Sequence, residues 1–397
     1  MRCLYRDMQT PEQICWRCHN TDPNYFYTDE KGTYCRRCVS FGRLEVNQKP
    51  VSPKLSQKVL KIEPVLEFSL TEAQQSVSDQ ARKILAAQKS CMIYACTGAG
   101  KTELTLGAIS DYLSQGKKVC FAISRRQVVL EIAKRLSANF PTLKVIAVCQ
   151  GYTKETDADL IVCTTHQLYR YPGCFDLLIL DELDAFPYAG NQVLEQIAQN
   201  SCRGQKLLLT ATPDKACLEA VERGEMEMIE LFVRPHGHPL CLPQVCRLPQ
   251  WMALIHVIYR CRSWSRQKKR VLLFLPRKSD GIWMKAVLSP FCRAERIHSS
   301  TPNKDEIMDA FREKKLEVLV CTTLLERGIT VPSVQVLVWR ADHAVFTTAS
   351  LIQILGRVGR VYTDPSGASV CYISRPARNL KECIRQLAWM NSSARSA

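Results

Sequence analysis

The sequence lacks the features of a membrane-spanning, secreted or disordered chain. It has no run of about 18 or more apolar residues, which argues against a membrane-spanning helix. Its N-terminus carries Arg2, Arg6 and Asp7 and no apolar core, which argues against a secretory signal peptide. Low-complexity tracts and short-period repeats are also missing, and 46% of the residues are hydrophobic, so we expect folded domains. The expected location is the cytoplasm.

Acidic residues are the minority among the charged side chains. Subtracting 38 Asp and Glu from 54 Lys and Arg leaves a formal charge of +16, with a pI near 9.1. This charge indicates a polyanionic partner, and both nucleic acid and the acidic inner face of a membrane fit it. The 397 residues are enough for two or three domains of about 150 residues each.

Short apolar runs alternate with amphipathic stretches from residue 91 onward. The first series predicts strands at Cys91–Ala95, Val119–Ile123, Val145–Val148, Leu160–Cys163, Leu177–Leu180 and Leu207–Thr210, with helices at Glu103–Ser114, Gln127–Phe140 and Val193–Asn200. The second predicts strands at Val271–Leu275, Val318–Cys321, Val334–Trp339 and Ser369–Ile373, with helices near 250–268, 303–315 and 347–357. This alternation predicts two tandem α/β domains, each with a parallel sheet covered by helices.

Composition sets the expected boundaries. Residues 1–45 are rich in Cys, Tyr and Arg and form a small module, and residues 46–69, with prolines and lysines among polar residues, form a linker. The first α/β domain is expected at 70–224, a connection at 225–248 and the second domain at 249–397.

Four of the 20 cysteines occur in paired spacing. Cys15-x-x-Cys18 and Cys35-x-x-Cys38 predict a tetrahedral zinc site, which is structural because four protein ligands leave no position for a substrate water. About 40 residues cannot bury enough core to fold alone, so the metal would supply the folding free energy. The aromatic and basic residues between the cysteines could stack on a single strand of nucleic acid or form the miniature core of the module. The unpaired cysteines are expected to be free thiols that pack as small apolar side chains.

A glycine-rich loop follows the predicted strand Cys91–Ala95 and precedes a predicted helix. Its residues are Cys96-Thr97-Gly98-Ala99-Gly100-Lys101-Thr102. In this setting the loop predicts an ATP site, because backbone N–H groups and the start of a helix bind phosphate oxygens. Lys101 would neutralise the β- and γ-phosphates, and Thr102 would hold Mg²⁺.

Two carboxylates directly follow the predicted strand Leu177–Leu180. Asp181 would hold Mg²⁺, and Glu182 would orient and deprotonate the attacking water. In the second domain, Gln353-Ile354-Leu355-Gly356-Arg357-Val358-Gly359-Arg360 places two arginines three residues apart, and we expect Arg357 and Arg360 to share one face and reach the γ-phosphate. Hydrolysis would then depend on closure of the two domains.

These motifs occur in the order found in superfamily 2 helicases. The resemblance covers residues 70–375 and includes Asp181-Glu182-x-Asp184, Thr210-Ala211-Thr212 and Gln353-x-x-Gly356-Arg357-x-Gly359-Arg360. It implies two RecA-like domains, with Gln353 among the nucleotide contacts. It also implies backbone contacts to nucleic acid from Thr164-Thr165 and from the stretch Thr322–Thr330. Leu70-Thr71-x-x-Gln74 looks like the segment that recognises adenine, which makes Gln74 a candidate nucleotide contact.

A four-cysteine module joined to a compact helicase core resembles the ComFA family of late competence ATPases. The stretch Leu324–Thr330 and the segment Arg234-Pro235-His236-Gly237-His238-Pro239-Leu240 add to this likeness. The resemblance implies an ATP-dependent motor that draws transforming single-stranded DNA through the membrane channel. ComFC and DprA are the implied partners, and peripheral attachment to the inner face of the cell membrane is implied as well.

Two other functions fit the same motifs. PriA-type replication-restart helicases share the core, but their cysteine-rich insertion lies within the helicase region. A DNA-stimulated ATPase switch, which docks partners without processive translocation, would carry the same catalytic residues. A basic group at Arg262, Arg266, Lys268, Lys269 and Arg270 is either a nucleic-acid patch or a solvated helix end.

Overall fold

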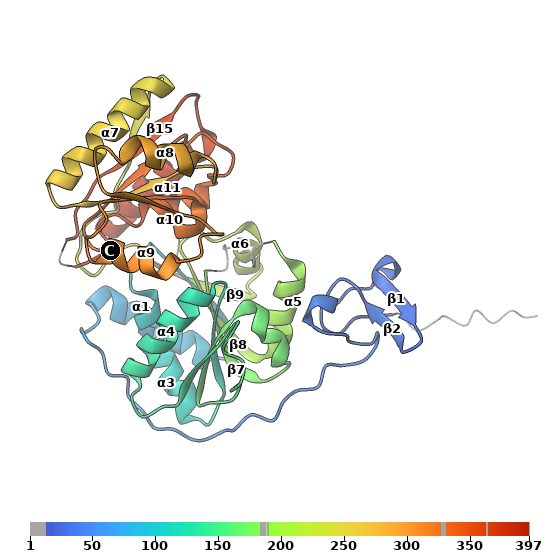
Figure 1. Cartoon of the computed structure of the whole chain (residues 1–397). Helices are drawn as coiled ribbons and strands as arrows, with labels where there is room; N and C mark the ends of the chain where they lie inside the picture. The colour runs from blue at the N-terminus through green and yellow to red at the C-terminus, as the bar shows by residue number, and fades with distance from the viewer. Residues whose placement is uncertain (1–12, 183–187, 189, 327–330, 363, 397) are drawn as a thin grey trace, which may run out of the picture.

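The computed structural model describes residues 13–182, 188, 190–326, 331–362 and 364–396. It consists of a small N-terminal module and two α/β domains (Figure 1). In the module, an antiparallel hairpin of β1 (Phe26–Asp29) and β2 (Gly32–Cys35) is flanked by the short 3₁₀ helices η1 (Pro23–Tyr25) and η2 (Val39–Phe41). The two larger domains confirm the predicted fold class.

The first domain contains a seven-stranded parallel sheet in the order β5-β6-β4-β7-β8-β3-β9. Its strands are β3 (Ser90–Ala95), β4 (Val119–Ile123), β5 (Val145–Val148), β6 (Leu160–Thr164), β7 (Phe175–Asp181), β8 (Cys202–Thr210) and β9 (Met226–Leu231). One face packs on α1 (Glu72–Ala86), α3 (Leu106–Ser114) and α4 (Arg126–Asn139). The other face packs on η3 (Thr165–Arg170), α5 (Gln192–Ser201) and α6 (Lys215–Glu222). The short helix α2 (Lys101–Leu104) follows β3.

The second domain contains a six-stranded parallel sheet in the order β10-β15-β14-β11-β13-β12. Its strands are β10 (Gln244–Arg247), β11 (Arg270–Phe274), β12 (Ala294–Ile297), β13 (Val318–Cys321), β14 (Val334–Val338) and β15 (Ser369–Ile373). One face packs on α7 (Gln250–Arg266) and α8 (Asp280–Leu288). The other packs on α9 (Lys304–Arg312), α10 (Thr348–Leu355) and α11 (Arg378–Ser396), and η4 (Thr323–Glu326) follows β13.

The strand positions correct the expected boundaries between the domains. β9 pairs with β3 in the first sheet, so the first domain extends past residue 224 to Leu231. β10 pairs with β15, so the second domain begins before residue 249. The connector between the sheets is therefore residues 232–243. Both strands were missed because they lie at sheet edges, where half-exposed polar residues interrupt the apolar run that marks a central strand.

Residues 46–69, the predicted linker, lie against the first domain as a strap. The strap runs beneath the domain in Figure 1. Leu60 N–H donates to Leu113 O at 3.0 Å, and Val65 N–H donates to Asn139 O at 2.8 Å. The buried Lys118 ammonium donates to Ser56 O at 2.9 Å. These contacts fix the path of the chain between the module and α1.

The C-terminal helix α11 joins the two domains and the connector. Trp389 of α11 lies 4.8 Å from Phe232 and 6.1 Å from Tyr94 between ring centroids. Asn391 forms two hydrogen bonds with the backbone of Leu240 in the connector. Within the described ranges, no helix is both long and apolar enough to cross a membrane.

Candidate active site

The phosphate loop runs from the end of β3 into α2 with two glycines in the left-handed region. Gly98 has φ of 85° and Gly100 has φ of 81°, conformations that side chains with a Cβ rarely adopt. Gly100 is the N-cap of α2 and supplies no capping side chain, so the first N–H groups of the helix face the loop. This geometry forms a cradle for phosphate oxygens between Thr97 and Thr102.

Gln74 supports this loop from α1. Thr71 N–H donates to Gln74 Oε1 at 3.0 Å in a capping box, and Gln74 Nε2 donates to Ala99 O at 2.8 Å. A Cβ on Gly100 would lie 2.5 Å from Gln74 Nε2 and would displace this brace, and the φ of 81° also favours glycine. Gln74 is therefore a support of the loop in this structure, and its contact with adenine stays a prediction.

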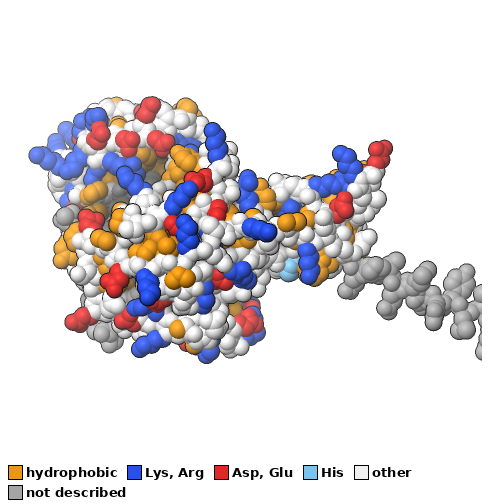
Figure 2. Space-filling view, turned by 90° about the horizontal axis from the view of Figure 1, so that it is seen from below, with side chains coloured by type: hydrophobic (Ala, Val, Ile, Leu, Met, Phe, Trp, Pro, Cys, Tyr) orange, Lys and Arg blue, Asp and Glu red, His pale blue; other side chains and the backbone are white. Residues whose placement is uncertain are grey.

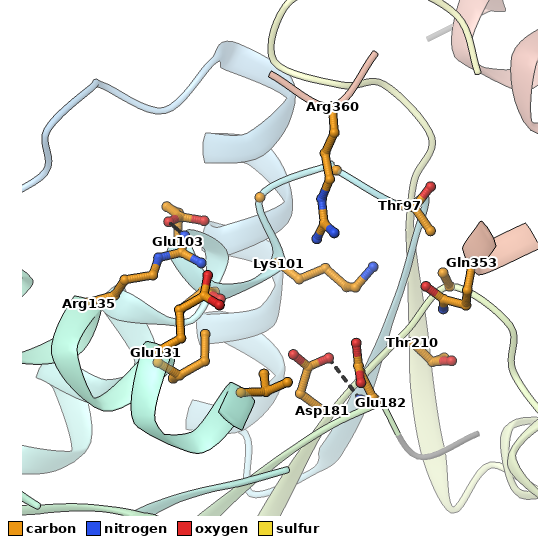
Figure 3. A pocket seen from close by; sticks show the side chains of 16 residues that line it. Thr97, Lys101, Glu103, Glu131, Arg135, Asp181, Glu182, Thr210, Gln353 and Arg360 are labelled. Carbon is orange, nitrogen blue, oxygen red and sulfur yellow. Dashed lines mark hydrogen bonds and ion pairs between the residues drawn. The ribbon is translucent and has the colours of Figure 1, made fainter. Parts of the chain in front are cut away.

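Lys101 extends across the cavity toward the acidic residues (Figure 3). Its ammonium donates to Ala95 O at 3.0 Å and Cys96 O at 3.2 Å. Burial lowers the pKa of Lys101, and the Asp181 carboxylate acts against that shift. A phosphate group would replace the two carbonyl contacts with a stronger charge-assisted partner.

The two carboxylates at the end of β7, Asp181 and Glu182, line the same cavity. Asp181 Oδ1 accepts a hydrogen bond from Glu182 N–H at 2.9 Å. Glu182 has φ of 57°, a left-handed conformation that is strained for this residue type and typical of functional sites. Asp181 and Thr102 both line the cavity, as a Mg²⁺ site would require. Asp184 lies outside the described residues.

Arg357 lies in the turn that follows α10, and Arg360 comes directly after that turn. The helix α10 ends at Leu355, and the chain then turns, with Gly359 at φ of 61°. Arg360 enters the cavity with Gln353, and Figure 3 shows it pointing toward Lys101. Arg357 is 5% exposed and is not part of the cavity lining. Arg360 therefore lines the cavity beside the phosphate loop, and the role of Arg357 at the γ-phosphate stays a prediction.

The cavity has a volume of about 230 Å³ and is built from both domains. Its cationic and acidic groups are Lys101, Glu103, Asp181, Glu182 and Arg360, and α4 adds Glu131 and Arg135. Arg135 forms an ion pair with Glu103. The α4 residues were not predicted, because an amphipathic helix gives no signal of which polar residues face a ligand. The donor set fits a nucleoside triphosphate with Mg²⁺.

Sequence reasoning also missed Arg234, which lies in the connector between the domains. Arg234 is 2% exposed and contacts the phosphate loop through Thr97 O. The same guanidinium contacts the turn that precedes Arg360. Its segment was noted for its likeness to the ComFA family, but spacing alone does not reveal a buried arginine.

The four cysteines of the N-terminal module come together as predicted. Their Sγ atoms all lie within 4.8 Å of one another, and all four residues are buried. The Cys15–Cys38 and Cys18–Cys35 Sγ distances are 3.5 and 3.7 Å. A tetrahedral ion with Zn–S bonds of about 2.3 Å places its ligands roughly 3.8 Å apart, so the cluster fits zinc. The aromatic residues Tyr25 and Tyr27 are about half exposed, with Arg37 and Arg36 near their rings.

The module docks on the first domain and stands out from it as a separate lobe (Figure 2). Asn200 of α5 donates to Trp16 O at 2.8 Å and Arg17 O at 3.1 Å. Phe41 stacks on His166 of η3 with ring centroids 6.0 Å apart. Since η3 begins at Thr165, the module lies next to a segment that the resemblance assigns to the nucleic-acid backbone.

Basic residues are spread over the molecule. On the face in Figure 2, Lys and Arg side chains occur on both the body and the lobe, with Asp and Glu between them. Arg262 and Arg266 lie on the exposed face of α7, but Arg270 is 3% exposed and donates to the backbone carbonyls of Phe311 and Arg312. The inclusion of Arg270 in a surface patch is therefore wrong, because it holds β11 to the end of α9. Residues 327–330 of the second-domain motif lie outside the described residues.

Two protein-family models match the two domains. Residues 67–215 match the type III restriction enzyme res subunit, and residues 250–362 match the helicase conserved C-terminal domain. The fold is similar to that of RecG bound to a three-way DNA junction, with a TM-score of 0.60 and 20% identity over 83% of this chain and 47% of that one. The fold, the composite cavity and these models define an ATP-dependent DNA helicase or ATPase with two RecA-like domains.

Curated relatives identify the family. Competence protein ComFA of Streptococcus pneumoniae is 33% identical over 96% of this chain and 91% of its own length. Competence protein ComFA of Bacillus subtilis is 31% identical over 96% of this chain and 86% of its own length. The chain belongs to the ComFA family, which confirms the resemblance noted from the motifs.

Proposed function

We propose that the protein is an ATP-driven translocase on single-stranded DNA that draws transforming DNA into the cell during natural competence. The observation that supports this most strongly is the composite cavity. Lys101, Asp181 and Glu182 come from the first domain, and Arg360 comes from the second. A site completed by two domains couples hydrolysis to their relative movement, which is what a motor requires.

In the proposed cycle, ATP and Mg²⁺ bind at the phosphate loop while the domains come together. Asp181 and Thr102 would hold Mg²⁺, Lys101 neutralises the terminal phosphates, and Glu182 orients the attacking water. Arg360 stabilises the charge that develops on the γ-phosphate. Loss of that phosphate weakens the contacts between the domains, so the domains separate and the strand is held alternately by each.

The positive charge and the position of the N-terminal module support a nucleic-acid track along the first domain. A formal charge of +16 favours phosphate contacts that carry no sequence information. The module contacts η3 through Phe41, and it carries half-exposed tyrosine rings paired with arginines, which are suited to stacking with bases. Zinc in the four-cysteine site would stabilise this module. ComFC, DprA and the membrane channel are the proposed partners, with peripheral attachment to the membrane.

The test is ATP hydrolysis with no nucleic acid, with single-stranded DNA of increasing length, with duplex DNA and with single-stranded RNA. A translocase gives stimulation that rises with strand length, because longer strands allow more steps before dissociation. Stimulation that saturates at one binding footprint would support the alternative of a DNA-stimulated switch. Equal stimulation by RNA would contradict the assignment to DNA.

A further inference from the structure

Arg234 is among the largest fully buried side chains of the molecule and lies between the two domains. Its Nε donates to Thr97 O at 2.9 Å in the phosphate loop. One terminal nitrogen donates to Val358 O and Gly359 O, each at 2.8 Å, and the other donates to Gly356 O at 3.1 Å. A single guanidinium thus joins the phosphate loop of the first domain to the turn of the second.

The Arg234 guanidinium is a buried positive charge that is satisfied by backbone carbonyls instead of a carboxylate. A buried charge is normally paired with an opposite charge, yet no carboxylate forms an ion pair with Arg234 within the described part of the chain. Burial lowers the pKa of Arg234, although arginine keeps its proton. Backbone carbonyls are its acceptors, and three of the four belong to the turn. The position of that turn is therefore what satisfies the charge.

Neighbouring contacts fix the connector on both sides of Arg234. Phe232 packs on Tyr94, with ring centroids 5.0 Å apart, at the end of β3. Leu240 is bonded to Asn391 of α11 in the second domain. His236 Nε2 lies 3.0 Å from Gly359 O, the carbonyl that directly precedes Arg360. The connector is thus anchored to each domain, and Arg234 bridges them at the ATP cavity.

We propose that Arg234 is a positioning residue that sets Arg360 against the phosphate loop and thereby makes hydrolysis depend on domain closure. Its acceptors on Gly356, Val358 and Gly359 immediately precede Arg360. When the domains are together, the Arg234 guanidinium holds the turn of residues 356–359 against Thr97 of the phosphate loop. When the domains separate, the guanidinium loses its acceptors on one of the two domains and must be hydrated. Partly closed arrangements, which leave some of its N–H groups without either carbonyl or water, are therefore disfavoured, and the change between open and closed domains becomes more cooperative.

The test compares Arg234→Gln and Arg234→Lys with Arg360→Gln and with the double variant. A misplacement of about 1 Å can lower a rate by roughly 100-fold, so Arg234→Gln should lower kcat by about that factor while the KM for ATP changes by less than about threefold. Lysine keeps the charge but cannot span the phosphate loop and the turn with one ammonium, so Arg234→Lys should fall between wild type and Arg234→Gln. Arg223→Gln removes an exposed arginine and is the matched control.

The double variant separates positioning from a merely structural role. If Arg234 acts through Arg360, then adding Arg234→Gln to Arg360→Gln should cost less than about threefold further in kcat, because the same step is already lost. Multiplicative losses, or a loss confined to ATP affinity, would overturn the inference. The site assignment fails separately: if Arg360→Gln alone keeps full turnover, Arg360 is not the group that completes the cavity. Near-ultraviolet circular dichroism of each variant establishes that the core is folded. If Arg234→Gln fails this check, Arg234→Lys takes its place as the single variant and in the double variant.

Discussion

A single methyl group at Gly356 would test whether hydrolysis occurs in the closed arrangement seen here. A Cβ at this position would overlap the Thr97 side chain, and its contact with the Thr97 Cγ2 would be 2.8 Å. Thr97 belongs to the phosphate loop of the first domain, whereas Gly356 follows α10 in the second. Gly356→Ala therefore acts as a wedge between the domains and leaves the interior of each unchanged.

The size of the effect follows from the overlap. Forcing an extra methyl group into a packed contact costs about 1–3 kcal/mol. Separation of the domains relieves this strain, so the cost applies to closure and not to folding. At about 1.4 kcal/mol for each factor of ten, kcat should fall by roughly 5- to 150-fold. The affinity for ATP should change little, since Lys101 and Thr102 lie in the first domain.

The assay is steady-state ATP hydrolysis with saturating single-stranded DNA, together with binding of a fluorescent ATP analogue. Gly281→Ala is the matched control, because a Cβ on Gly281 of α8 meets no atom within 4 Å. The control should keep wild-type turnover and gain about 0.5–1 kcal/mol in stability from the helix propensity of alanine. Wild-type turnover by Gly356→Ala would refute the reasoning, since hydrolysis would then not require this contact between the domains.

Three further changes test other parts of the molecule. Lys101→Ala should lower ATP turnover by roughly 100-fold or more with a folded core, and retained hydrolysis would contradict the assignment of the cavity. Cys15→Ser should release zinc and expose residues 13–45 to trypsin while the domains stay protected, which metal analysis and limited proteolysis measure; full zinc content would count against the site. Burial lowers the pKa of His236 below its ordinary 6.5. The unfolded state therefore binds a proton at a higher pH than the folded state does. The free energy of unfolding is highest above about pH 6.5 and falls as the pH drops through the folded-state pKa. Urea unfolding at about pH 7.5 and pH 5.5 should show this loss, and His236→Gln should reduce it; an equal loss in both proteins would show that another group is responsible.

Local pattern was sufficient for the central strands and for the loops that follow them. Val119–Ile123 and Val318–Cys321 were predicted with the bounds that the structure gives, because strands buried on both faces are continuous apolar runs. The edge strands β9, β10 and β12 were missed because polar residues interrupt their apolar runs, whereas the edge strand β5 is apolar throughout and was predicted. Residues 46–69 were predicted only as a linker, and their contacts with Leu113, Asn139 and Lys118 show that this linker is a strap on the first domain. Composition does not reveal such distant partners.

By itself, the sequence determined the class of protein and the chemistry of its sites. The phosphate loop, the Asp181-Glu182 pair and the four cysteines depend on residue type and short spacing, which are local properties of the chain. Only the tertiary structure decided how the second domain completes the cavity. Arg357 and Arg360 are equivalent in the motif, but in the folded chain Arg360 lines the cavity and Arg357 is buried outside its lining. Arg234 gains its place because its guanidinium meets carbonyls more than 120 residues away in the chain. Contacts across such separations depend on how two sheets pack, and no local pattern encodes them.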